Sequence, residues 1–324
     1  MFLHFLKLIR AKNLLIIIFT QYLMRYAVIF PILASRGYKS QFSDLNFFLL
    51  VLTTVLLAAA GYAINDYFDT KTDLINRPET VVVGKHINRR HVMTLHIVLN
   101  TLAVILGFYI SWQIHLWKLL YIYIIITGLL WFYSTSYKKQ FLVGNIIVAF
   151  LTAMVPLMTV LYEIPPLNKE YFDTLLELKD NFNDVFFWIV GFSVFAFLTI
   201  LTREIIKDVE DFEGDKAYGS RTMPVVAGIK TSKIVTISLT VITLALLAFA
   251  YIKYLMYPCP DCINIDYISA IYLGIFVALP SFFLIFKIVK AHDKKDWHTA
   301  STISKIIMLF GVLYALIAYY NFLY

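Results

Sequence analysis

The sequence predicts an all-α polytopic membrane protein, in which nine transmembrane helices surround a central cavity with an aspartate-rich cap on its cytoplasmic side. Of the 324 residues, 60% are hydrophobic and only 15% are charged, whereas about a quarter of the residues in a soluble domain are charged. Nine apolar segments approach the length of about 20 residues that a helix needs to cross a bilayer. They lie at residues 17–33, 47–63, 92–110, 116–132, 142–161, 185–205, 234–252, 267–288 and 303–322. We expect one integral membrane domain over residues 1–324, without an additional soluble domain.

Two aspartate motifs with the same spacing, D-x-x-D-x-x-x-D, stand where the second and sixth spans end. Positions i, i+3 and i+7 share one face of a helix, so each motif predicts a row of carboxylates on the last turns of its span. Such a row repels itself unless cations lie against it. Mg²⁺ fits best, because it binds a few carboxylates together with the phosphates of a substrate. The candidate metal ligands are Asp66, Asp69, Asp73, Asp208, Asp211 and Asp215. Solvated loop charges are the alternative interpretation.

A basic residue and then a proline follow each motif, as Arg77-Pro78 and as Arg221-Thr-Met-Pro224. The two motif-bearing spans point the same way and are four spans apart. This arrangement predicts a weak internal repeat of four-helix units, with motifs at 65–78 and 203–224.

The distribution of basic residues predicts the orientation. With nine spans, the amino terminus and the loops after spans 2, 4, 6 and 8 share one side, and they hold most of the 28 Lys and Arg. Basic loops face the cytoplasm, so we expect both motifs there, in a bacterial or archaeal plasma membrane. The net charge of +7 is then mainly a topology signal. Nucleic-acid binding is not expected, because the basic residues are dispersed and no recognised binding module is present.

Several cations flank the acids, which a site for metal alone would not need. They are Arg77, Arg203, Lys207 and Arg221. Metal ions together with Arg and Lys neutralise a diphosphate. Neither a Walker-type glycine loop nor a dinucleotide fingerprint is present, so a nucleotide is not the expected source of that diphosphate. A diphosphate at the mouth of an apolar cavity indicates a lipid tail, and an isoprenyl diphosphate fits.

At this point the chain resembles the UbiA superfamily of intramembrane prenyltransferases over nearly its whole length. The first family signature is matched by Asn65-Asp66-x-x-Asp69-x-x-x-Asp73, and the second by the motif at 208–215. Nine spans is the usual number in that family. Arg10-Ala-Lys-Asn13 is similar to the family's entry segment, with alanine in place of proline, and Tyr133-Ser-Thr-Ser-Tyr137-Lys138 resembles its tyrosine-and-lysine motif.

The resemblance implies Mg²⁺-dependent transfer of a prenyl group from its diphosphate to a lipophilic acceptor within the membrane lipid. Two Mg²⁺ ions would be held by the six aspartates with help from Asn65, and Tyr133 would face the allylic cation. Such a cation needs a cavity without water. The residues expected to contact substrate are Asn13, Arg77, Lys138, Arg203, Lys207 and Arg221.

Two features leave the acceptor open. The amino-terminal segment at 8–17 and the context at 206–215 resemble the branch that alkylates geranylgeranylglyceryl phosphate, whereas an aromatic acceptor of quinone biosynthesis is the alternative. A phosphate on the acceptor would need further cations. Lys12, Lys85, Arg89 and Lys139 are candidates, or else they only set topology. A transporter is the non-enzymatic alternative, but it would favour acids near the bilayer midplane.

Arg25 is a cation within the first span. It shares a helical face with Asn13 and Gln21, and we expect it to pair with Glu163 or Asp44 or to reach the outer interface. A direct substrate role is the alternative. The outer loop at 163–184 contains Pro165-Pro166 and is expected to form an amphipathic or irregular cap. Cys259 and Cys262 alone cannot complete a structural zinc site.

Overall fold

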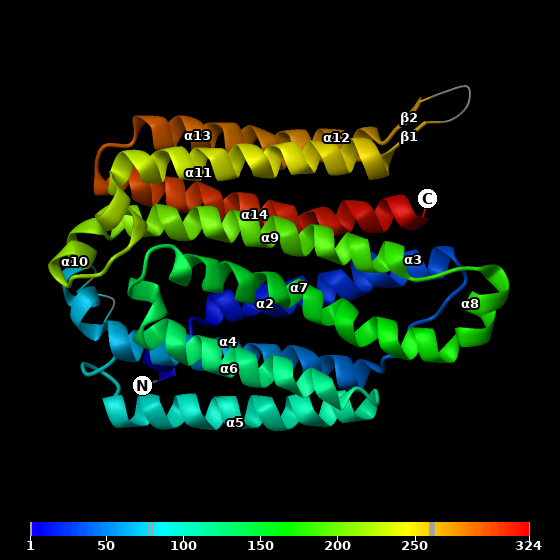
Figure 1. Cartoon of the computed structure of the whole chain (residues 1–324), viewed down its shortest axis with the longest axis horizontal. Coiled ribbons are helices and arrows are strands. Elements are labelled where there is room, and N and C mark those ends of the chain that lie inside the picture. Colours follow the sequence, from blue (N-terminus) through cyan, green and yellow to red (C-terminus); the bar gives the residue numbers. More distant parts are fainter. Residues whose placement is uncertain (1, 77, 80, 259–262, 324) are drawn as a thin grey trace.

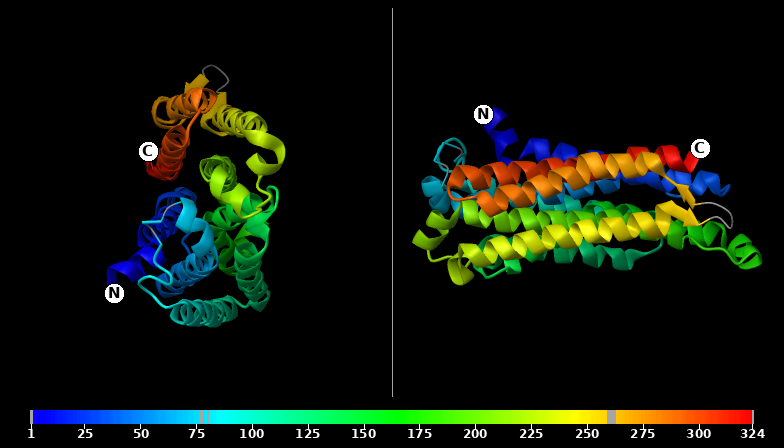
Figure 2. Two further views of the ribbon diagram at one scale, coloured as in Figure 1. Left: turned by 90° about the vertical axis from the view of Figure 1, so that its left-hand side faces the viewer. Right: turned by 90° about the horizontal axis from the view of Figure 1, so that it is seen from above.

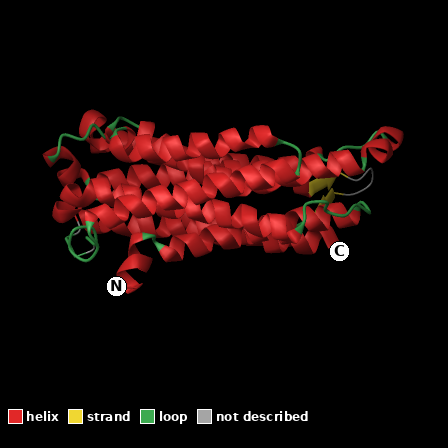
Figure 3. Cartoon of the chain, turned by 90° about the horizontal axis from the view of Figure 1, so that it is seen from below, coloured by secondary structure: helices red, strands yellow, loops and turns green. Residues whose placement is uncertain are grey.

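The structure, a computed structural model, describes residues 2–76, 78–79, 81–258 and 263–323. Its long helices run along one axis, and the loops collect at the two ends (Figures 1 and 3). These described residues contain nine helical stretches that are long and apolar enough to cross a membrane. The predicted helical membrane fold with nine spans is therefore confirmed, and each span is longer than its apolar segment.

The spans are built from the following elements. The first comprises α2 (Ala11–Leu23), a π-helical segment (Met24–Ile29) and α3 (Phe30–Ser35), after the short α1 (Phe2–Leu8). The next five are α4 (Asp44–Asn76), α5 (Arg89–Gln113), α6 (Leu120–Thr135) with the 3-10 turn before it (Trp117–Leu119), α7 (Val143–Glu170) and α9 (Asn183–Glu210). The short α8 (Phe172–Leu178) precedes α9, and α10 (Phe212–Ala217) follows it. The seventh span is α11 (Met223–Ala250) with a π-helical end (Tyr251–Leu255). The eighth consists of α12 (Tyr267–Tyr272), a π-helical segment (Leu273–Ala278) and α13 (Leu279–Lys290), and the ninth is α14 (Lys294–Leu323).

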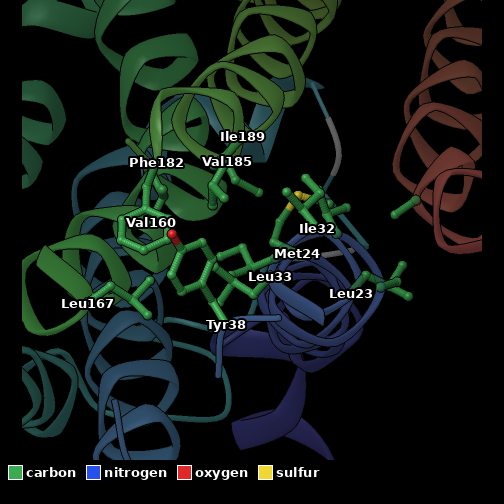
Figure 4. Close-up of a cluster of buried hydrophobic side chains, with 14 residues drawn as sticks. Leu23, Met24, Ile32, Leu33, Tyr38, Val160, Leu167, Phe182, Val185 and Ile189 are labelled. Carbon is green, nitrogen blue, oxygen red and sulfur yellow. The ribbon is translucent and has the colours of Figure 1, made fainter. Parts of the chain in front are cut away.

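Helix α9 is the centre of the arrangement, because it contacts α7, α11 and α14. Viewed from the end that carries α10, the amino-terminal helices and α14 lie on one side of the bundle (Figure 2). Consistent with this view, α14 also contacts α2 and α3. The buried apolar side chains form separate clusters. One lies between the first span, α7, α9 and α14 and includes Met24, Leu33, Val160 and Ile189 (Figure 4). A bundle packed in separate clusters can retain an internal cavity.

Two features of the end opposite α10 differ from the prediction. A short antiparallel hairpin, β1 (Met256–Pro258) with β2 (Ile263–Ile265), interrupts the otherwise helical chain. Cys259 and Cys262 lie outside the described residues. In addition, α7 continues through Pro165 and Pro166 to Glu170, so the expected cap begins only with α8. Packing accounts for the continued helix, since Leu167 is fully buried beyond the prolines.

Arg25 is anchored at this same end, as the sequence predicts. Its Nε lies 2.7 Å from Glu163 Oε1, and its Nη1 lies 3.1 Å from Asp44 Oδ1. Arg25 and Glu163 are 1% and 0% exposed, and the guanidinium also donates to the Phe42 carbonyl. The ion pair therefore ties the first span to α7 and to the start of α4.

A second ionic cluster links the loop after α3 to the segment before α9. Arg36 Nη1 lies 2.6 Å from Asp184 Oδ1, and Arg36 also pairs with Asp180. The Tyr38 hydroxyl donates to Asp180 Oδ2 at 3.0 Å. Hydrogen bonding from the Arg36 guanidinium lowers the pKa of Asp180 below its ordinary value.

Candidate functional site at the motif end of the bundle

A cavity of about 1100 Å³ opens at the end of the bundle that carries both aspartate motifs. Its wall along α4 extends from the motif to Thr54. From Asp66 to Thr54 the helix rises by about 18 Å. Carboxylates and cations line the mouth, whereas Met24, Leu57 and Met158 are among the mainly apolar residues of the deep part. The cavity thus joins a charged entrance to a long apolar interior.

The first motif forms the predicted row on one helix. Asn65, Asp66, Asp69 and Asp73 all belong to the last turns of α4, and all four line the cavity. Arg10 Nη2 lies 2.9 Å from Asp66 Oδ1, and Lys138 Nζ pairs with Asp69. Protein cations therefore lie against two of the acids, as the repulsion within such a row requires.

The second motif does not form a row on one helix, which corrects the prediction. Only Asp208 lies on the span, because α9 ends at Glu210. Asp211 has φ −98° and ψ 12°, outside helical geometry, and Asp215 lies on α10. All three carboxylates still line the cavity. After this change of direction α10 packs against α4, so the motif crosses the cavity mouth.

The two motifs interact electrostatically across that mouth. The pKa of Asp215 is raised to about 6, mainly by burial and also by the charges of Asp211 and Asp69, while the charge of Lys138 acts in the opposite direction. Asp69 belongs to the first motif, so carboxylates of both motifs lie within range of each other. Such crowding favours a cation near them.

The predicted cations and polar residues separate into three groups. Asn13, Tyr133, Lys138, Arg203 and Lys207 line the cavity. Arg221 is exposed and outside the cavity lining, with its backbone N–H donating to the Lys139 carbonyl at 2.7 Å. Arg77 lies outside the described residues.

The lysines and arginine considered for binding a phosphate on the acceptor do not all lie at the cavity. Lys139 lines the cavity. Lys85 instead donates to the Pro78 carbonyl at 2.8 Å, and Arg89 lies 4.2 Å from the centre of the Tyr67 ring. These two side chains are held away from the cavity.

Some polar residues of the site were not predicted as such. Asn145 Nδ2 donates to Asp208 Oδ2 at 2.8 Å. Glu204 bonds Arg203 at 3.1 Å and Lys207 at 3.0 Å. Arg10 stands in the entry segment at 10–13, so its sequence context was a usable signal. Glu204 directly follows Arg203 and precedes Lys207 by three residues, so helical spacing was a usable signal for its ion pairs. Asn145 gave none, because an isolated polar residue in an apolar span usually only satisfies local hydrogen bonds.

As the side chains stand, no group of three or more His, Cys, Asp or Glu among the described residues is placed to hold a metal ion. Arg10 and Lys138 lie against the carboxylates instead. The donor set nevertheless fits Mg²⁺. It consists of carboxylate and amide oxygens, and Mg²⁺ takes the rest of its ligands from water and substrate phosphates.

Comparisons with known proteins agree with this geometry. Residues 26–310 match the model of the UbiA prenyltransferase family. The chain is 30% identical to a digeranylgeranylglyceryl phosphate synthase of Methanobrevibacter smithii, over 85% of this chain and 86% of that one. A relative of the same name from Thermococcus kodakarensis is 29% identical over 83% and 84% of the two chains.

Two solved structures share the fold. A structure described as digeranylgeranylglyceryl phosphate synthase superposes with a TM-score of 0.63 at 23% identity, covering 97% of this chain and 98% of the other. A UbiA homologue of Archaeoglobus fulgidus bound to GPP and Mg²⁺ gives 0.52 at 16% identity, covering 97% and 99%. The sequence matches support an enzyme over the transporter alternative. This integral membrane chain belongs to the UbiA prenyltransferase family.

Proposed function

We propose that the protein catalyses Mg²⁺-dependent transfer of a geranylgeranyl group from its diphosphate to geranylgeranylglyceryl phosphate. The names of the two relatives described above support this acceptor. The observation that carries the proposal is the cavity, in which acids and cations surround the mouth of a long apolar interior. A diphosphate at the mouth would leave its isoprenoid chain in that interior, and the acids would face the cytoplasm.

The reaction forms one carbon–oxygen bond and breaks another. The acceptor hydroxyl oxygen attacks the first carbon of the prenyl chain, and the diphosphate leaves with the bonding electron pair. The hydroxyl proton passes to the departing diphosphate, and an ether remains. When bound, Mg²⁺ supplies positive charge that stabilises this leaving group. We infer two ions, held by the six aspartates with Asn65.

The cations of the chain bind and orient the donor. Lys138 and Arg10 already lie against Asp69 and Asp66, so they are placed to contact phosphate oxygens beside those acids. Lys207 lines the same mouth from α9. Charge-assisted hydrogen bonds from such groups are about twice as strong as neutral ones, which fixes the diphosphate during bond cleavage.

The walls protect the reactive carbon. Tyr62 and Tyr133 line the cavity next to the motifs, and an aromatic face attracts a cation through its quadrupole. The apolar residues below them exclude water, which would otherwise quench an allylic cation.

The proposal is tested with purified protein in nanodiscs, labelled geranylgeranyl diphosphate, and a panel of geranylgeranylglyceryl phosphate and aromatic acids. Asp66→Asn and Asp208→Asn should each lower transfer by more than about 100-fold, since even residues that only support metal ligands are worth 10- to 100-fold. Chelation of Mg²⁺ should abolish transfer. Asp173→Asn, on the exposed α8 at the other end of the bundle, is the matched control.

Two results would contradict parts of the proposal. Full activity in either motif variant would exclude the two-motif mechanism. Alkylation of an aromatic acid alone would exclude the glyceryl phosphate acceptor and leave the mechanism intact.

A further inference from the structure

We propose that Lys305 and Arg203 form a separate binding site for the phosphate monoester of the lipid acceptor. The site lies where α14 and α9 meet the cavity. This inference rests on the proposed function, because it assumes an acceptor that carries a phosphate. It divides the charged mouth into a donor region at the aspartate motifs and an acceptor region beside α14.

Lys305 is a cation that the donor chemistry does not use. It lines the main cavity and also a smaller cleft of about 160 Å³, shared with Arg203, Lys207 and Thr302. The positive charges of Arg203 and Lys12 act on its ammonium group. No carboxylate of the described chain forms an ion pair with Lys305. An amine on a membrane span among other cations is unfavourable unless an anion joins it.

Arg203 provides the second half of the site. Its Nη1 donates to Glu204 Oε1 at 3.1 Å. Its Nε is buried, and none of the described residues accepts a hydrogen bond from it. A guanidinium presents its N–H groups as a planar fork that matches two phosphate oxygens. A phosphate in the cleft would therefore satisfy a donor that the fold leaves unpaired.

The acids of this region do not cancel the positive charge. Glu204 is shared by Arg203 and Lys207, and Glu210 lies 3.0 Å from the ring of His298. The charge of Asp208 also interacts with those of Glu204 and Lys207. Three carboxylates thus lie near Arg203, Lys207, Lys305 and Lys12. The surplus is positive even with neutral histidine, which favours an anion.

The position suits an acceptor rather than the donor. Arg203 precedes Asp208 by five residues, so it lies about 7.5 Å deeper along the helix axis than the second motif. In a glyceryl phosphate the reacting hydroxyl is close to the phosphate. A phosphate at Arg203 would place that hydroxyl below the donor diphosphate, next to the first prenyl carbon. Ile306 and Leu309 continue the cavity wall from Lys305 into the membrane, beside the expected lipid chain.

The experiment compares Lys305→Gln with wild type and with Lys295→Gln, an exposed lysine at the start of the same helix. KM is measured separately for geranylgeranyl diphosphate, geranylgeranylglyceryl phosphate and geranylgeranylglycerol, which lacks the phosphate. Equilibrium binding of labelled geranylgeranylglyceryl phosphate is measured without donor or Mg²⁺. Thermal unfolding verifies that each variant is folded.

We expect Lys305→Gln to raise KM and Kd for the phosphorylated acceptor by about 10-fold or more, the usual range for a hydrogen bond to a charged group. The KM for the diphosphate and for the unphosphorylated alcohol should change less than about twofold, as should every value of Lys295→Gln. Lys305→Arg should restore most of the affinity.

Three outcomes would overturn the inference. An increase in KM for the diphosphate alone would assign Lys305 to the donor site. An equal effect on both acceptors would show that the phosphate is not what Lys305 binds, and unchanged constants would exclude any role in binding. If the wild-type protein used no phosphorylated acceptor, the proposed function itself would be refuted. The wild-type assay shows this before any variant is made.

Discussion

Replacing Arg25 by methionine should destabilise the protein without changing substrate affinity. Glu163 would keep a hydrogen bond from Ser40 at 2.8 Å but lose its guanidinium partner at 2.7 Å. Removing one partner of a buried ion pair costs about 3–5 kcal/mol. The pair with Asp44 adds little, because that carboxylate is 80% exposed and exposed ion pairs contribute about 0–1 kcal/mol.

The size of this effect depends on the charge that remains buried. Glu163→Gln keeps an isosteric hydrogen-bonding group and leaves Arg25 with Asp44, so it should cost less than Arg25→Met. Combining Arg25→Met with Glu163→Met removes both charges, and replacing a buried pair by apolar residues is often nearly neutral. We therefore expect the double variant to be more stable than Arg25→Met alone.

The assay is reversible unfolding in mixed micelles of a mild detergent and sodium dodecyl sulfate. Wild type, Arg25→Met, Glu163→Met and the double variant are compared as a double-mutant cycle, with Glu163→Gln measured beside them. KM for the prenyl diphosphate is measured far below the unfolding temperature and should stay within about twofold. Arg90→Met, an exposed change on α5, is the control and should alter stability by less than about 0.5 kcal/mol. Unchanged stability of Arg25→Met together with a raised KM would refute the structural role and restore the substrate role.

Three further predictions follow from individual contacts. Asn145→Ala removes the 2.8 Å hydrogen bond to Asp208 and should raise the Mg²⁺ concentration for half-maximal transfer by about 10- to 100-fold; an unchanged Mg²⁺ titration would contradict a supporting role. Gly311→Ala would place a Cβ 2.0 Å from the ring of Phe195, a residue of the cavity wall. This overpacking should lower the free energy of unfolding by about 1–3 kcal/mol. An unchanged melting temperature would show that the ring moves aside without cost. Because the pKa of Asp180 is lowered, its ion pair with Arg36 stabilises the fold fully above the ordinary pKa of an aspartate, and this stabilisation is lost as pH falls through the lowered pKa. The melting temperature of Asp180→Asn should therefore fall less than that of wild type when the pH is lowered below about 4. An equal fall in both proteins would argue against the pair.

The membrane fold and the first motif could be predicted from local information. An apolar run of sufficient length dictates a spanning helix, since no other structure satisfies the backbone of a single segment in lipid. The spacing of Asp66, Asp69 and Asp73 places them on one face of α4, and helical periodicity alone decides this. The partners of Arg25 were predictable for a similar reason, because a charge within a span requires an opposite charge at the same depth.

Features that depend on contacts between distant segments could not be read in this way. The turn at Asp211 brings α10 against α4, and no periodicity encodes a contact between helices so far apart in the chain. The same holds for Asn145 beside Asp208 and for Lys305 beside Arg203, which lie on different helices.

The sequence by itself therefore determined the class of protein, the number of spans and the acids that line the cavity, because these follow from hydrophobic length, spacing and charge. Only the tertiary structure decided which cations face those acids, where Arg221 lies, and that Lys305 lines the cavity without an ion pair among the described residues. The physical reason is that a helix's own residues specify its faces, whereas the neighbour that each face meets depends on how all the helices pack together.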